Sequence, residues 1–119
     1  MASGAMTTFG LNYALDKDLD AQTLYMAIGT GTADAAVTDT ALETEGARVA
    51  LSTNSISGVV WTVEGYFNSS KASGSVITEA GIFDAASSGN MICRQTFVGQ
   101  SKEIGMHLTH TLTTTLANA

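Results

Sequence analysis

The feature that most constrains the fold is a period-two pattern of apolar side chains between Val59 and Phe67. Every second position carries an apolar residue or glycine, in the order Val59, Trp61, Val63, Gly65 and Phe67. A period of two residues is the period of a β-strand, whereas an amphipathic helix repeats every 3.6 residues. The segment is therefore predicted to be a strand with one face buried.

Five other segments show strand signals and are separated by turn-forming residues. They are residues 23–28, 47–53, 76–83, 91–98 and 105–116. The polar stretch 68–74 and the sequence Ala86-Ser-Ser-Gly-Asn90 predict turns between them. Short strands at this spacing predict an all-β fold, an antiparallel β-sandwich or a small barrel.

The beginning of the chain has a different pattern. Residues 8–19 are predicted to form a short N-terminal helix or arm, and residues 40–45 one helical turn with Asp39 as its cap. We expect an arm over residues 1–22 and a β domain over residues 23–119. A chain of 119 residues is long enough for a single buried core.

Charge and composition exclude several kinds of partner. The net charge is −6, and the five basic residues are scattered along the chain, so no nucleic-acid surface is expected. No apolar run reaches the ~18 residues needed to span a membrane. Cys93 is the single cysteine, so an intrachain disulfide is excluded. A buried free thiol is the preferred interpretation, and an intersubunit bond stays open.

Motifs for catalysis or cofactor binding are incomplete. Gly29-Thr-Gly31-Thr has Asp34 where a dinucleotide fingerprint needs its third glycine. His107 and His110 fall on opposite faces of the last strand, so they cannot share a metal. No Gly-x-Ser-x-Gly sequence marks a nucleophile. We expect no enzyme activity, no cofactor and no metal.

Two segments carry a resemblance to a known family. The first contains Gly29-Thr-Gly-Thr32, then Thr38-Asp-Thr-Ala-Leu42, Glu45 and Arg48, and the second is Ile77-Thr-Glu-Ala-Gly-Ile-Phe-Asp-Ala85. Together they resemble small virion structural proteins of tailed bacteriophages, over residues 23–116. The chain departs from the family at Asp34, where proline is usual.

The resemblance implies a protein located on the phage particle and made in the cytoplasm of the host bacterium. Capsid decoration is the leading interpretation: a cement protein, as a homotrimer, that binds the major capsid protein and identical subunits. A tail, collar or fibre-adaptor subunit is the alternative. A carbohydrate-binding module, with exposed Trp61 or Tyr66 stacking on sugar, is a third possibility, although the alternation favours a core position for Trp61.

The same reasoning selects candidate contact residues and one ion pair. The subunit or capsid contacts are expected at Phe9, Leu11, Tyr13, Leu15, Gly29, Thr30, Gly31 and Thr32. Glu79 is predicted to share an apolar face with Ile77, Gly81 and Phe83, so its carboxylate needs a partner. Arg48 and Arg94 are the candidates, because the resembling family carries arginine at both places.

Overall fold

The computed structural model describes residues 3–6, 23–36, 38–57 and 60–115, and every regular element within these ranges is a β-strand. The strands are β1 (Ser3–Met6), β2 (Tyr25–Gly29), β3 (Glu45–Ser57), β4 (Val60–Phe67), β5 (Ser75–Phe83), β6 (Met91–Lys102) and β7 (Leu108–Thr115). The all-β prediction is confirmed. Strands β2 to β7 overlap the segments that the sequence predicted, and β1 was not predicted.

The helix predicted at residues 8–19 lies outside the described residues. The helical turn predicted at residues 40–45 is wrong, because this segment is irregular until β3 begins at Glu45. The backbone N–H groups of Glu43 and Thr44 donate to the side chain of Glu79. That distant carboxylate replaces the local hydrogen bonds that a helical turn needs.

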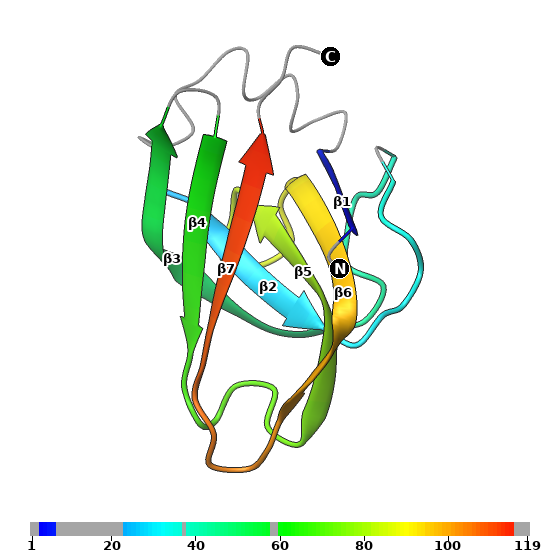
Figure 1. Cartoon of the computed structure of the whole chain (residues 1–119), viewed down its shortest axis with the longest axis vertical. Helices are drawn as coiled ribbons and strands as arrows, with labels where there is room; N and C mark the ends of the chain where they lie inside the picture. Colours follow the sequence, from blue (N-terminus) through cyan, green and yellow to red (C-terminus); the bar gives the residue numbers. More distant parts are fainter. Residues whose placement is uncertain (1–2, 7–22, 37, 58–59, 116–119) are drawn as a thin grey trace.

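The strands form one sheet in the order β1-β6-β5-β2-β3-β4-β7 (Figure 1). All neighbouring pairs are antiparallel. The long strand β3 belongs to both halves: Glu45–Ala50 pairs with β2, and Leu51–Ser57 pairs with β4. A register shift between Leu51 and Thr53 marks the bend, as expected for a β-bulge.

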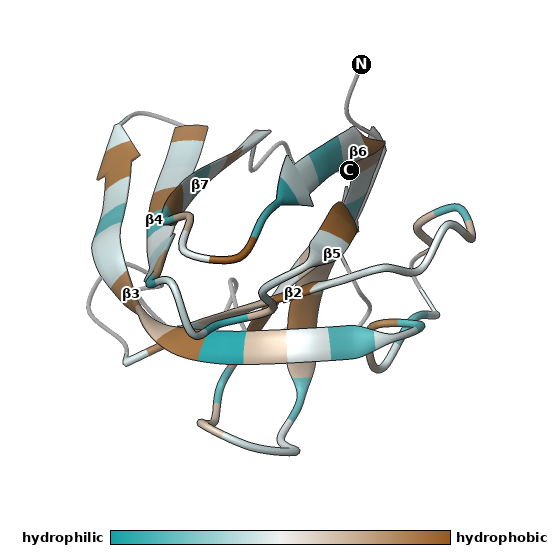
Figure 2. Cartoon of the chain, turned by 90° about the horizontal axis from the view of Figure 1, so that it is seen from below, coloured by the Kyte–Doolittle hydropathy of each residue, from teal (hydrophilic) through white to brown (hydrophobic). Residues whose placement is uncertain are grey.

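The bend curls the sheet into a nearly closed barrel (Figure 2). The curl brings β7, at one end of the sheet, next to β6 near the other end (Figure 1). The two strands are not paired in the described sheet, and β1 covers only Cys93–Thr96 of β6. We call the unpaired junction between β6 and β7 the seam.

The main core fills the inside of the curl. Its buried residues are Leu24, Met26, Ile28, Trp61, Val63, Phe67, Ile77, Ala80, Ile82, Ile92, Cys93 and Leu112. A second, smaller cluster consists of Ala27, Leu42, Phe83 and Met91. Alternate residues of β2 enter the two clusters, so this central strand is buried on both faces. The second face is covered by the segment between β2 and β3, which contains most of the first family-like segment.

Candidate functional site

Glu79 lies on β5 and is fully buried. The sequence placed it on one face with Ile77, and this is wrong. The β5–β6 register shifts between Ile77 and Glu79, and Ile77 packs in the main core with Ala80 and Ile82. The shift turns Glu79 away from that core, towards the segment that follows β2.

The carboxylate of Glu79 anchors both ends of the segment between β2 and β3, residues 30–44. Its Oε2 accepts hydrogen bonds from the backbone N–H groups of Gly31 and Thr44, both at 2.8 Å. Its Oε1 accepts a hydrogen bond from the N–H of Glu43 at 2.9 Å. The neighbouring Thr78 hydroxyl donates to the Gly31 carbonyl at 2.7 Å. One buried carboxylate thus replaces the backbone pairing that an irregular segment lacks.

Arg94 supplies the charge that the buried carboxylate needs. Its Nε donates to Glu79 Oε1 at 3.0 Å, and its Nη1 donates to Asp39 Oδ2 at 3.2 Å. Its Nη2 also lies 3.0 Å from Glu79 Oε1, but without the geometry of a hydrogen bond. Arg94 is itself buried, in β6 beside β5. A buried charge pair with further hydrogen bonds meets the condition under which such burial is tolerated.

Arg48, the other candidate partner of Glu79, is engaged elsewhere. Its guanidinium pairs with Glu45 at 2.7 Å and donates to the carbonyl groups of Ala85 and Ser88. It also lies over the ring of Phe83, with 3.7 Å between Cζ and the ring centroid. Arg48 therefore ties β3 to the β5–β6 turn. It is not part of the cluster formed by Glu79, Arg94 and Asp39, which we call the Glu79 cluster.

Two glycines let the segment approach Glu79. A Cβ on Gly29 would lie 2.1 Å from the carbonyl oxygen of Thr44, and one on Gly31 would lie 2.6 Å from Glu79 Oε2. Both glycines are buried, whereas Thr30 and Thr32 are exposed. The glycines of the predicted contact therefore serve internal packing. Contact by the two threonines stays a prediction.

Two further carboxylates organise the middle of the segment. Glu43 Oε1 accepts hydrogen bonds from the N–H groups of Thr32 and Ala33, and Asp39 Oδ2 accepts one from Ala36. The bonds from Ala33 and Thr32 lower the pKa of the Glu43 carboxyl below its ordinary value. Glu43, Asp39 and Glu79 all accept hydrogen bonds from backbone N–H groups. Together they fix the shape of this surface segment.

The other predicted contacts, Phe9, Leu11, Tyr13 and Leu15, lie outside the described residues.

A buried lysine, which the sequence analysis did not single out, joins the two loops at the opposite end of the barrel. Lys102 is 1% exposed, and its Nζ donates to the carbonyl groups of Asn68 and Met106 at 2.7 and 2.8 Å. Its own carbonyl accepts a hydrogen bond from the N–H of Gly74. The β4–β5 and β6–β7 connections are thereby held together. The sequence gives no signal for this, because an isolated lysine normally indicates a solvated surface.

The seam forms a pocket of about 470 Å³ between β6 and β7. Its lining residues are Gln95, Phe97, Val98, Gln100, His110, Thr111 and Thr113. The rings of Phe97 and His110 stack across the seam with centroids 4.7 Å apart. His110 is 8% exposed, and its Nε2 has no hydrogen-bond partner among the described residues. Burial lowers the pKa of this imidazole, which favours its neutral form.

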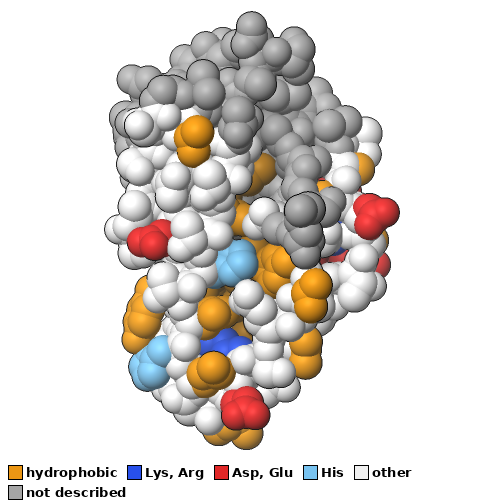
Figure 3. Space-filling model, viewed as in Figure 1, with side chains coloured by type: hydrophobic (Ala, Val, Ile, Leu, Met, Phe, Trp, Pro, Cys, Tyr) orange, Lys and Arg blue, Asp and Glu red, His pale blue; other side chains and the backbone are white. Residues whose placement is uncertain are grey.

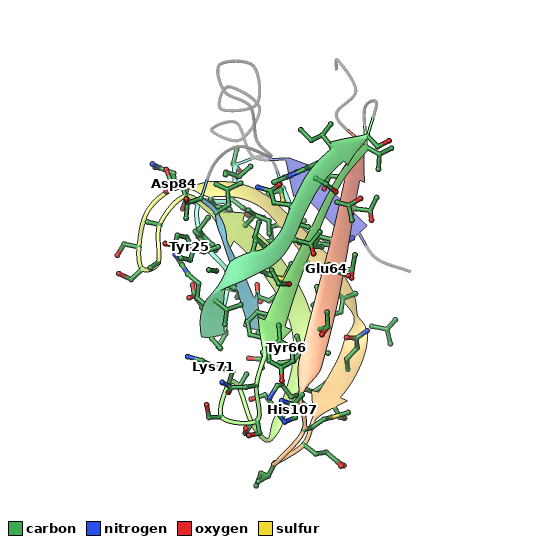
Figure 4. The ribbon with its side chains drawn as sticks, turned by 90° about the vertical axis from the view of Figure 1, so that its left-hand side faces the viewer. Tyr25, Glu64, Tyr66, Lys71, Asp84 and His107 are labelled. Atoms are coloured by element: carbon green, nitrogen blue, oxygen red, sulfur yellow. The ribbon has the colours of Figure 1, made fainter. Side chains whose placement is uncertain are left out.

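The aromatic side chains leave little support for sugar stacking. Trp61 is 1% exposed and donates its Nε1 hydrogen to Asn54 Oδ1 at 2.7 Å, so it belongs to the core as the alternation favoured. Tyr66 is 48% exposed, but its ring stacks on that of His107, and the phenol oxygen is hydrogen-bonded to His107 Nδ1 (Figure 4). Stacking with His107 therefore covers one face of the Tyr66 ring, the exposed aromatic ring that was a candidate for sugar binding.

No group of three His, Cys, Asp or Glu side chains within the described ranges is placed to hold a metal ion. Across the same residues, no helix combines the length and apolar character required to cross a membrane.

Comparison with known proteins identifies the family. No curated protein and no solved structure matches the chain significantly. A protein-family profile described as "Podophage GP4 fiber I protein gp80" matches residues 16–114, which include β2 to β6, nearly all of β7 and the whole Glu79 cluster. The chain therefore belongs to the family of the podophage GP4 fiber I protein gp80, a family of phage virion structural proteins.

Proposed function

We propose that this protein is a structural subunit of the phage fibre, or of the part of the tail that carries the fibre. The observation that carries the proposal is the family match over residues 16–114. The matched family is described as a fiber protein of a podophage. Capsid decoration, the leading expectation from the sequence, has no comparable support. It is the rival outcome of the test below.

The role is mechanical rather than enzymatic. Two buried charged groups hold the backbone in place: Glu79 anchors residues 30–44, and Lys102 joins two loops. A segment held in this way keeps its shape under load, because it opens only if buried charges lose their partners. This supports a part that transmits or resists force in a particle.

The expected partners are identical subunits, in a homotrimer, together with neighbouring proteins of the tail or fibre. Homo-oligomers with closed symmetry are the usual form of multi-subunit structural proteins. The edges of the seam support association, since neither Phe97–Gln100 of β6 nor Leu108–Thr115 of β7 contains a charged residue or proline. Unguarded strand edges are otherwise sites of unwanted pairing.

The copy number of the protein in purified virions tests the proposal. Quantitative mass spectrometry, with the major capsid protein as internal reference, should give a small number of copies for each particle. Immunogold labelling should place these copies at the tail. A copy number comparable to that of the major capsid protein, with label over the head, would instead establish decoration.

A further inference from the structure

The seam is the one face of the described barrel where both the sheet and its hydrogen bonding are incomplete. Strand β1 pairs with Cys93–Thr96 of β6, and among the described residues no strand pairs with the rest of that edge, from Phe97 onwards. Within the same described ranges, no strand pairs with the outer edge of β7 either. Between the two edges, the buried Nε2 of His110 has no partner among the described residues. A polar atom that is buried and unpaired is a costly feature that a bound partner can relieve.

Exposed apolar side chains lie around the β6–β7 connection and on the neighbouring parts of β5 and β6. Four exposed ones form what we call the apolar rim: Val76, Val98, Ile104 and Met106. Val98 and Ile104 are 76% and 87% exposed, and Figure 3 shows apolar side chains gathered in this half of the molecule. Exposed apolar side chains next to an open strand edge are typical of a protein interface.

Charge favours a second copy of this chain as the partner. The chain carries a net charge of −6, so two copies repel each other over most of their surfaces. The pocket lining contains no Asp, Glu, Lys or Arg, and the nearby Lys102 is buried. The Thr111 hydroxyl donates to Glu64 at 3.1 Å, and the exposed Glu103 precedes Ile104 of the rim. The seam is thus a face on which identical acidic chains can approach each other.

The strand that can move between copies is β1. Its four residues, Ser-Gly-Ala-Met, are uncharged, and it pairs with β6 alone. Residues 7–22 join it to the segment that leads into β2. Sixteen residues can span roughly 50 Å when extended, which exceeds the 40 Å length of the molecule. The connection is therefore long enough for β1 to reach β6 of a neighbouring molecule.

We propose that copies of this chain associate across the seam by exchanging β1, so that Ser3–Met6 of one copy pairs with Cys93–Thr96 of the next. Exchange keeps every backbone pair of β1. The edge of β6 that receives β1 continues into the seam, so exchange places the neighbouring copy beside the seam and Val98 of the apolar rim. The proposal rests on the homo-oligomer of the proposed function, and it names the contact that builds that oligomer.

Cysteine cross-linking between two singly substituted chains tests the exchange. Ser3 and Thr96 are directly opposed in the β1–β6 register, and opposed positions of antiparallel strands have a spacing that a disulfide can bridge. Ser3→Cys and Thr96→Cys chains are purified, mixed, unfolded and refolded together, and then oxidised. We expect a disulfide-linked pair of unlike chains on a non-reducing gel. Burial raises the pKa of the native Cys93 thiol to about 12, so this thiol stays protonated and does not compete.

Matched controls make the result decisive. Ser3→Cys mixed with Thr53→Cys should give no linked pair, because Thr53 is exposed on β3 and pairs with β4 rather than β1. A chain with both Ser3→Cys and Thr96→Cys tests whether these two cysteines can bond at all. If that chain forms a bond only within itself, and the mixture of single variants stays unlinked, β1 is not exchanged and the proposal is overturned.

The apolar rim provides an independent measurement that does not depend on the new cysteines. Val98→Lys places a charge at an exposed position, so the fold should be kept, while association measured by sedimentation should weaken about tenfold or more. Thr53→Lys carries the same charge change away from the seam and should leave association unchanged. An oligomer that persists in Val98→Lys would overturn the seam interface. An oligomer that forms without cross-links would overturn exchange alone, leaving the proposed homo-oligomer in place.

Discussion

Replacing Glu79 with glutamine removes one negative charge from the inside of the protein and leaves the shape of the side chain almost unchanged. The carboxylate accepts hydrogen bonds from the N–H groups of Gly31, Glu43 and Thr44 and from Nε of Arg94. Each of its oxygens accepts two of these four bonds. A glutamine has one oxygen and one NH₂ group, so in either orientation two buried donors face another donor.

The expected loss follows from these contacts. Removing one partner of a buried ion pair costs about 3–5 kcal/mol, and a domain of this kind has a total stability of about 5–15 kcal/mol. We expect Glu79→Gln to lower the free energy of unfolding by about 3–5 kcal/mol. This corresponds to a fall of about 10–20 °C in Tm for a chain of this size. Urea titration and thermal melting followed by circular dichroism measure both quantities.

Glu45→Gln is the matched control, because it makes the same chemical change in a pair that is partly exposed. The side chain of Glu45 is 34% exposed and contacts Arg48 at 2.7 Å. A pair near the surface contributes about 0–1 kcal/mol, so Tm should fall by less than about 5 °C. Hydrogen exchange adds a local measurement: the amides of Gly31 and Thr44 should exchange faster in Glu79→Gln. If Glu79→Gln and Glu45→Gln melt together, and these amides stay protected, the anchoring role of Glu79 is refuted.

Three further predictions concern the same segment and the core. Gly31→Ala should destabilise the protein by about 1–3 kcal/mol through overpacking, because its Cβ would lie 2.4 Å from that of Glu43, whereas Gly46→Ala, with nothing nearer than 3.5 Å, should have little effect on urea midpoints. The folded pKa of Glu43 lies below the ordinary value of 4.5, so its stabilising effect should be complete above that pH and lost as the pH falls through the folded pKa. On going from neutral to acidic pH, the Tm of Glu43→Gln should therefore fall less than the Tm of the natural protein. Equal falls in Tm would contradict this. Because burial raises the pKa of the Cys93 thiol to about 12, Ellman's reagent should react with it only after unfolding, and rapid labelling at neutral pH would show that this region opens.

The strands were predictable because their signal is local. Alternation between Val59 and Phe67 placed β4 to within one residue of its observed start, and it correctly assigned Trp61 to the core. Sequence reasoning placed His107 and His110 on opposite faces of the last strand; in the structure His107 precedes β7 and is exposed, whereas His110 lies in β7 and is buried. A strand repeats every two residues whatever it packs against, so these features can be read without knowledge of the fold.

The Glu79 cluster was partly predictable. A carboxylate in an apolar strand requires a positive partner, and both arginines could supply it on sequence grounds. Only the register of β5 with β6 decides between them, because it places Arg94 opposite Gly81, two positions along the strand from Glu79. The same register shift defeated the prediction that Ile77 shares a face with Glu79. A bulge adds one residue to one strand and reverses every face beyond it, and its position depends on both strands together.

By itself, then, the sequence determined the class of fold and the positions of most strands along the chain. It also carried enough signal for the family profile to match residues 16–114. The tertiary structure alone decided that the carboxylate of Glu79 holds both ends of residues 30–44, and that Lys102 is buried between two loops. It alone decided that β6 and β7 stay unpaired within the described sheet. The reason is physical: each of these features joins residues far apart in the chain, and the distance between such residues is set by sheet curvature and strand register rather than by local preference.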